Sequence, residues 1–132
     1  MARVSDLKNV SWQCVHFAQP NSIDVLKHDL STEGFYIKEF DSSSVKSDRD
    51  LFSYIANAFE FPDYFGNNWD SMDECLADID LSHSKGAVLI LSNASCLWKE
   101  AAYTAGKLLS VWQGAAELWG DENKPFHLVF VL

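Results

Sequence analysis

The chain has 132 residues, of which 48% are hydrophobic and 14% are aromatic. It carries 19 acidic residues against 10 lysines and arginines, which gives a formal net charge of −9 at pH 7. A chain of this length and composition fits one domain with a hydrophobic core, and this excludes an intrinsically disordered protein. The negative charge disfavours nonspecific binding to nucleic acid or to an anionic membrane, whereas it allows a basic partner.

Cysteine usage and the absence of targeting segments bear on the compartment. Cys14, Cys75 and Cys96 are an odd number and show no CxxC spacing. This argues against a disulfide framework or a zinc ribbon, so we expect small buried side chains in a reducing compartment. The first twenty residues lack the apolar core of a signal peptide, and no stretch has the roughly 20 apolar residues that a transmembrane helix needs. These features predict a cytoplasmic protein.

The hydrophobic pattern alternates between strands and helices along the chain. In chain order the expected elements are a strand over 10–17, a helix over 22–30, a strand over 35–40, a helix from Ser47 or Asp48 to about residue 60, a helix over 69–78, a strand over 87–91, a long helix over 97–119 stopped by Gly120, and a strand over 126–132. The last two strands are continuous apolar runs, which are typical of strands buried on both faces. The alternation predicts an α/β layered fold with a mainly parallel sheet.

The sequence contains no assembled catalytic or metal-binding motif. The phosphate-binding patterns GxGxxG and GxxxxGK[ST] are absent, as are HExxH and GxSxG. The four histidines, His16, His28, His83 and His127, are scattered, and the two in or beside predicted strands suit core or edge positions. Residues 78–82 start like a calcium loop, but the required Gly and Glu are missing further on. We therefore expect no enzyme, no cofactor and no metal.

The segment from Asp50 to Ser84 contains eight acidic residues and no lysine or arginine. Three of them, Asp70, Asp73 and Glu74, lie close together on one helix, on its flank or outer face. Like charges four residues apart destabilise a helix by a few tenths of a kcal/mol. A capping box from Asn67 to Asp70 and the helix dipole explain Asp70, but Glu74 lies one turn further on, where the dipole effect has faded.

Two aromatic residues and a glycine flank this acidic cluster. Tyr64 and Trp69 suit packing positions, and they also suit anchors of a protein interface. We expect Gly66 to adopt a positive φ and hold the loop in one shape, which reduces the ordering entropy lost on binding. The loop and helix together predict an acidic binding face.

Residues 61–76, FPDYFGNNWDSMDECL, resemble the signature of the barstar family. The shared pattern is an acidic residue, two aromatics, Gly, any residue, Asn, and an acidic helix that ends in Cys-Leu. A looser similarity extends from about residue 35 to 132. The resemblance implies a single barstar-like domain over 1–132, with 35–132 as the family core and 1–34 as an N-terminal strand–helix extension. Its sheet would have three strands plus an extra N-terminal strand.

Members of this family are intracellular inhibitors that plug the active site of a secreted ribonuclease with the loop and the following helix. The resemblance implies that the partner-binding residues are Tyr64, Gly66, Asn68, Trp69, Asp70, Asp73 and Glu74. Two of them depart from the family pattern: Glu74 stands where barstar carries an Asp, and Asp73 stands where barstar carries a Trp.

The sequence therefore predicts a barstar-like inhibitor or immunity protein that blocks the basic active site of a secreted ribonuclease or nuclease toxin. The alternative is an interaction module of the same fold that binds a basic partner other than a nuclease. The two departures and the extension motivate this alternative. An acid–base enzyme that uses Asp70, Glu74 and a histidine has the least support.

Overall fold

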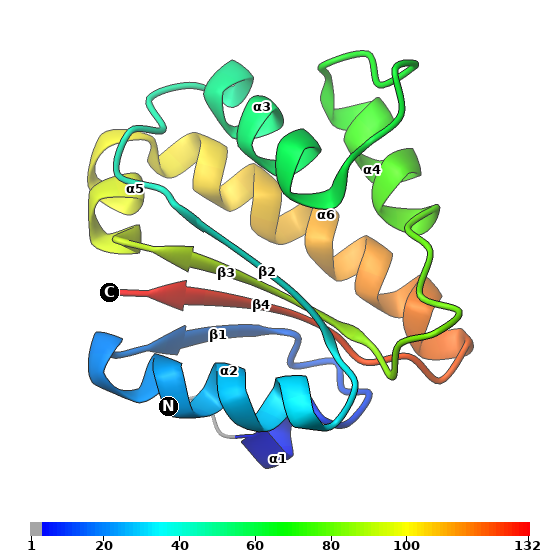
Figure 1. Ribbon diagram of the computed structural model, residues 1–132. Coiled ribbons are helices and arrows are strands. Elements are labelled where there is room, and N and C mark those ends of the chain that lie inside the picture. The colour runs from blue at the N-terminus through cyan, green and yellow to red at the C-terminus, as the bar shows by residue number, and fades with distance from the viewer. Residues whose placement is uncertain (1–3) are drawn as a thin grey trace.

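The computed structural model describes residues 4–132, which form a parallel sheet with helices on both faces (Figure 1). The elements in chain order are α1 (Val4–Leu7), β1 (Val15–Ala18), a 3-10 turn η1 (Pro20–Ser22), α2 (Ile23–Thr32), β2 (Tyr36–Asp41), α3 (Asp48–Phe59), α4 (Trp69–Ala77), β3 (Ala87–Ser92), α5 (Ala94–Glu100), α6 (Ala102–Asp121) and β4 (Phe126–Val131). The predicted α/β class is confirmed.

The sheet has the strand order β1-β4-β3-β2, and every neighbouring pair is parallel. β3 and β4 are the central strands and pair from Ala87 with Phe126 to Leu91 with Phe130. β1 pairs with β4 over Val15 to Ala18, so the N-terminal residues add a fourth strand at one edge. β2 forms the other edge.

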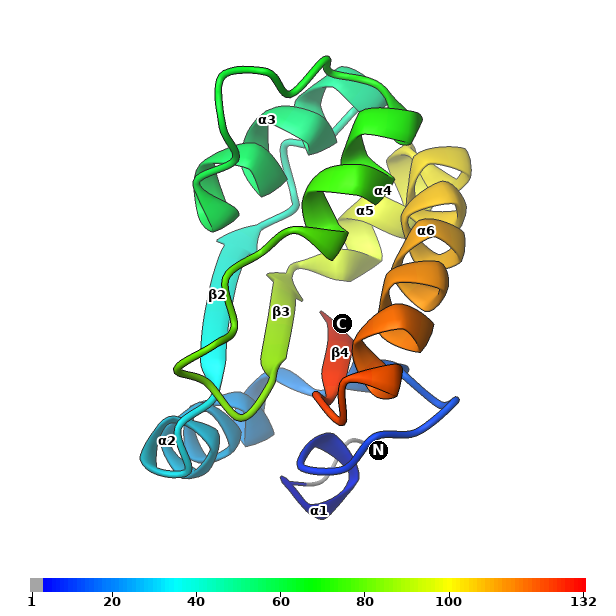
Figure 2. The ribbon, with the colours of Figure 1, turned by 90° about the vertical axis from the view of Figure 1, so that its right-hand side faces the viewer.

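Side chains of the central strands alternate between two hydrophobic cores. Leu89 and Leu128 belong to the larger core, under α3, α4 and α6, whereas Val88 and Val129 belong to the smaller core beneath α2. The two views of the ribbon show these helices on opposite faces of the sheet (Figure 2). Burial on both faces explains why these strands are continuous apolar runs.

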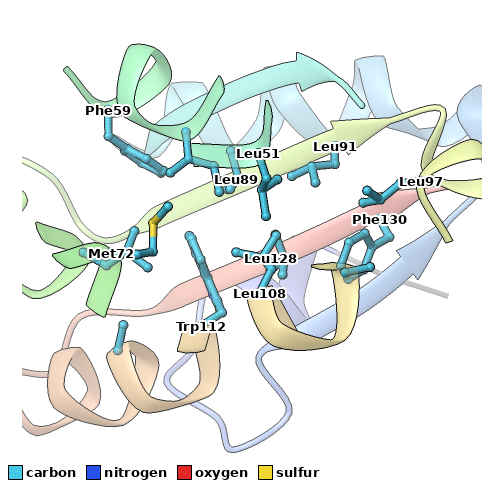
Figure 3. Close-up of a cluster of buried hydrophobic side chains, with 14 of the residues drawn as sticks. Leu51, Phe59, Met72, Leu89, Leu91, Leu97, Leu108, Trp112, Leu128 and Phe130 are labelled. Atoms are coloured by element: carbon cyan, nitrogen blue, oxygen red, sulfur yellow. The ribbon is translucent and has the colours of Figure 1, made fainter. Parts of the chain in front are cut away.

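Trp112 of α6 lies at the centre of the larger core (Figure 3). It is fully buried, its ring stacks on Phe126 with 4.3 Å between centroids, and its Nε1 donates a hydrogen bond to the Phe126 carbonyl at 3.2 Å. Leu108 and Met72 belong to the same cluster, so one core joins β4, α6 and α4. This shared core fixes α4, which carries the predicted acidic cluster, relative to the sheet.

Two predicted elements differ in the structure. The strand predicted over 10–17 is only Val15–Ala18, and Trp12 is 84% exposed, because residues 10–14 form a loop beside β4. The helix predicted over 97–119 is two helices, α5 and α6, which are separated at Ala101 (φ −144°, ψ 52°). Gly120 does not stop the second helix, which continues to Asp121. No glycine or proline marks the break; both helices contact β4, and α6 also packs against α4.

Cys14 and Cys75 are buried as expected, but Cys96 is exposed, and all three thiols are free. Within residues 4–132, no helix has the length and apolar character needed to cross a membrane.

Candidate protein-binding site

The loop that leads into α4 is anchored by aromatic packing. The Phe65 amide donates to the Pro62 carbonyl at 3.0 Å, which closes a turn. The Phe65 ring packs edge-on against Phe61 and Phe52, with centroids 5.2 and 6.1 Å apart. These contacts hold the loop against α3.

Gly66 does not have the positive φ predicted for it. The left-handed residue is its neighbour Asn67, with φ 53°. A Cβ at Gly66 would lie 2.9 Å from the Ser71 Oγ and 3.0 Å from the Asn68 Nδ2, so a larger residue would make these two side chains shift. The loop therefore folds closely over the start of α4, and the glycine permits that approach.

Asn68, not Asn67, caps α4. Its side-chain oxygen accepts a hydrogen bond from the Ser71 amide at 2.8 Å, and its Nδ2 donates to the Gly66 carbonyl at 3.2 Å. The predicted capping box starting at Asn67 is therefore wrong by one residue. Asn68 satisfies a free amide at the helix start and at the same time fixes the preceding loop.

The carboxylate of Asp48 joins three helices at the start of α4. Its Oδ2 accepts a hydrogen bond from the Trp69 Nε1 at 3.0 Å, and its Oδ1 accepts one from the Thr104 hydroxyl at 2.6 Å. Asp48 is the first residue of α3, Trp69 the first of α4, and Thr104 lies in the first turn of α6. We call this arrangement the Asp48 clasp. The Trp69 ring also packs edge-on against Phe52, so Trp69 supports the site from within.

Asp70, Asp73 and Glu74 project from the exposed side of α4. Among the residues that the structure describes, none of the three carboxylates forms a salt bridge. Asp70 lies in the first turn, where the helix dipole stabilises its charge. Glu74 has no such stabilisation, and α4 therefore presents negative charge that the described part of the chain leaves uncompensated.

Other acidic residues of the segment have local structural roles. The Asp50 Oδ2 accepts a hydrogen bond from the Lys46 amide at 2.9 Å. The Asp80 carboxylate accepts two from Ser82, which lower its pKa. Asp50 and Asp80 thus stabilise a helix start and a turn, whereas Asp70, Asp73 and Glu74 form no salt bridge within residues 4–132.

Tyr64 extends the acidic face at the far end of α4. Its side chain is 66% exposed. Partial desolvation raises the pKa of the Tyr64 phenol, and the nearby carboxylates of Asp78 and Glu74 raise it further. The Tyr64 hydroxyl therefore lies beside these acids, where it can donate a hydrogen bond to a carboxylate.

Asp73 lies where α4 meets α6. A Cβ added at Gly114 of α6 would be 3.9 Å from the Asp73 Oδ1, so the carboxylate sits directly over this glycine. Both residues are exposed. The acidic face consequently extends to the place where Asp73 faces α6.

Of the seven predicted site residues, Tyr64, Asp70, Asp73 and Glu74 form one exposed face, which we call the α4 face. Gly66, Asn68 and Trp69 shape the loop and helix behind it. Sequence reasoning missed Asp48, Thr104 and Asp78, because nothing local in the sequence links residues 48 and 104 to the start of α4. No group of three or more metal-ligating side chains occurs within the described residues.

The fold is thus a parallel α/β sheet whose helix layer displays an exposed acidic helix. The chain belongs to the barstar family: the sequence model of that family, described as Barstar (barnase inhibitor), matches residues 35–131. The match covers β2 to β4 with α3 to α6, whereas α1, β1 and α2 precede it. None of the curated proteins matches the sequence significantly.

Proposed function

We propose that this protein is an intracellular inhibitor, or immunity protein, that blocks the basic active site of a ribonuclease with the α4 face. The observation that carries this proposal is the set of three exposed carboxylates on α4 that lack a cationic partner among the described residues. Its membership in the barstar family supports the same function.

The physical basis is electrostatic complementarity. A ribonuclease stabilises negative charge on phosphate, so its active site is lined with cationic groups. A helix that presents several carboxylates at fixed spacing attracts such a site over long range and then occupies the position of the substrate phosphates. The capped helix, the packed loop and the Asp48 clasp hold these carboxylates in place before binding, which lowers the entropic cost of association.

The test is inhibition of RNA cleavage by a panel of secreted basic ribonucleases. We expect Asp70→Asn, Asp73→Asn and Glu74→Gln each to weaken inhibition. Asp24→Asn, which removes a charge from the exposed first turn of α2, is the matched control and should inhibit like the wild type. The association rate with a nuclease should fall steeply as salt is added. Equal inhibition by all four variants would show that the α4 face is not the binding site.

A specific observation favours a second candidate function, which is the binding of a basic partner other than a nuclease. Asp73 occupies a position where barstar carries a Trp, and its carboxylate lies beside Gly114 of α6. The charge of Asp73 favours a different side chain of the partner from the one that a Trp ring at this position would contact. If no ribonuclease is inhibited but a basic protein binds and loses affinity with Asp73→Asn, this second function holds.

We also propose that residues 1–34 are part of one domain with the family core. Supporting this, β1 hydrogen-bonds to β4, and the smaller core contains residues of α2 together with residues of β3 and β4.

A further inference from the structure

The two edges of the sheet differ in how they are protected against further strand pairing. Natural proteins protect exposed sheet edges with charged side chains, which discourage another strand from adding. β2 carries Lys38 and Glu39, and Glu39 pairs with Lys27 of α2 at 2.7 Å. β1, with the sequence Val-His-Phe-Ala, carries no lysine, arginine or carboxylate. The β1 edge therefore lacks the charges that protect the β2 edge.

The main chain of β1 has free pairing capacity on its outer side. The Cys14 carbonyl accepts a hydrogen bond from the amide of Leu128 in β4 at 2.8 Å. The Ala18 carbonyl accepts one at 2.9 Å from the amide of Leu132, the residue that follows β4. Since pairing alternates along a strand, the amides and carbonyls of Val15 and Phe17 point away from β4. No other strand of the described chain lies on that side (Figure 1).

An open cleft of about 720 Å³ lies along this edge, lined by residues 9–17 together with Asp6 and Gln113. Two aromatic side chains line it and are exposed, Trp12 at 84% and Phe17 at 45%. A second cleft, of about 590 Å³, adjoins it at Trp12 and Gln113 and is lined further on by Glu117 and Asp121. In the part of the chain that the structure describes, no lysine or arginine lines either cleft.

His16 contributes a hydrogen-bond acceptor to the cleft. The His127 Nε2 lies 2.8 Å from the carbonyl oxygen of Asn9, which can only accept, so this nitrogen carries the proton. The Nδ1 of neutral His127 is then an acceptor, and the His16 Nε2, 2.9 Å away, must donate to it. Neutral His16 consequently has an unprotonated Nδ1. Burial lowers the pKa of His16 to about 4, so the ring stays neutral at pH 7.

These observations define the chemistry of an occupant. An extended main chain supplies the donors and acceptors that Val15 and Phe17 lack. Asp6 and the His16 Nδ1 both accept hydrogen bonds, and the exposed face of Trp12 attracts cations, so arginine or lysine side chains complement the cleft. A second copy of the chain would bring the same acidic clefts together, and its net charge of −9 opposes such pairing.

We propose that the β1 edge is a second binding surface, which accepts an extended, arginine-containing segment of a basic partner by strand addition. This surface is separate from the α4 face and lies in residues that precede the family match. The proposal does not depend on whether the partner of the α4 face is a nuclease.

The test is a titration of the full-length protein with acetyl-Arg-Val-Arg-Val-Arg-amide, followed by amide NMR. We expect the Val15 and Phe17 amides to shift and to gain protection from hydrogen exchange. The peptide with glutamate in place of arginine should not bind. Val15→Pro removes one outward amide without touching the pairing with β4, and we expect it to weaken binding about tenfold or more.

Glu39→Pro is the matched control, because the Glu39 amide faces outward on the β2 edge, and peptide binding should be unchanged. Asp6→Lys is a second variant that changes only an exposed side chain and should weaken binding about fivefold or more. Absence of peptide binding, or binding that is insensitive to both Val15→Pro and Asp6→Lys, would overturn the proposal. Self-association in sedimentation runs that is lost with Val15→Pro would also overturn it and assign the edge to a second copy.

Discussion

The Asp48 clasp offers a direct test of how the start of α4 is held. Asp48→Ala removes two hydrogen bonds to a carboxylate and leaves the Trp69 indole N–H half-buried without its acceptor. Hydrogen bonds to charged groups contribute about 1.5–3 kcal/mol each. Because Asp48 is only partly buried, we take the lower end for both and expect a loss of about 3 kcal/mol in the free energy of unfolding. Such a loss is a large share of the roughly 5–15 kcal/mol that stabilises a typical domain.

Conservative variants test the two hydrogen bonds of the Asp48 clasp separately. Asp48→Asn keeps one oxygen for Trp69 and an amide that can donate to the Thr104 hydroxyl, so we expect a loss of only about 1 kcal/mol. Trp69→Phe removes the indole donor but keeps a ring against Phe52, and we expect a loss of about 1.5 kcal/mol in the free energy of unfolding. Urea denaturation followed by circular dichroism measures these losses.

The control and the double mutant make the result interpretable. Asp24→Ala removes an exposed acid from the first turn of α2 and should change stability by less than about 0.5 kcal/mol. In a double-mutant cycle, Asp48→Ala and Trp69→Phe should show a coupling of about 1 kcal/mol, because each alone breaks the same hydrogen bond. Strict additivity, or a cost of Asp48→Ala no larger than that of the control, would refute the clasp.

Two further predictions concern pH and the packing of glycine. Burial lowers the pKa of His16 to about 4 from an unfolded value near 6.5. The contribution of this histidine to the free energy of unfolding is therefore fully present above pH 6.5 and is lost as the pH falls toward 4. The urea midpoint should drop over this range in the wild type and in His28→Gln, an exposed control, but less in His16→Gln; identical profiles would contradict this. A Cβ at Gly86 would lie 2.3 Å from the Pro125 carbonyl oxygen, so Gly86→Ala should cost about 2–3 kcal/mol. Gly106→Ala, in open space on a helix, should instead stabilise by about 0.5–1 kcal/mol, and equal melting temperatures for the two variants would refute this assignment.

The sequence predicted the class of fold because hydrophobic periodicity is a local property. Continuous apolar runs at 87–91 and 126–132 indicated strands buried on both faces, and β3 and β4 are such strands. Periodicity failed at Ala101, where the apolar stripe continues although the backbone leaves the helical conformation (φ −144°, ψ 52°), because periodicity reports which face is buried and not where a helix breaks.

The candidate site was predictable only in part. The exposed positions of Asp70, Asp73 and Glu74 follow from helical spacing around the buried Met72 and Leu76. The conformation of the loop was not predicted: Asn67, and not Gly66, takes the left-handed conformation, and Gly66 lies close to Ser71 of α4.

By itself, the sequence determined a parallel α/β protein of one recognisable family, with an acidic excess concentrated between residues 50 and 84. Only the tertiary structure decided which of those acids form no salt bridge within residues 4–132, how Asp48 and Thr104 hold α4, and that β1 forms one edge of the sheet. The physical reason is the range of the interactions. Hydrophobic spacing and helix capping act within a few residues, whereas charge pairing, side-chain hydrogen bonds between helices and strand order depend on residues that are far apart in the chain.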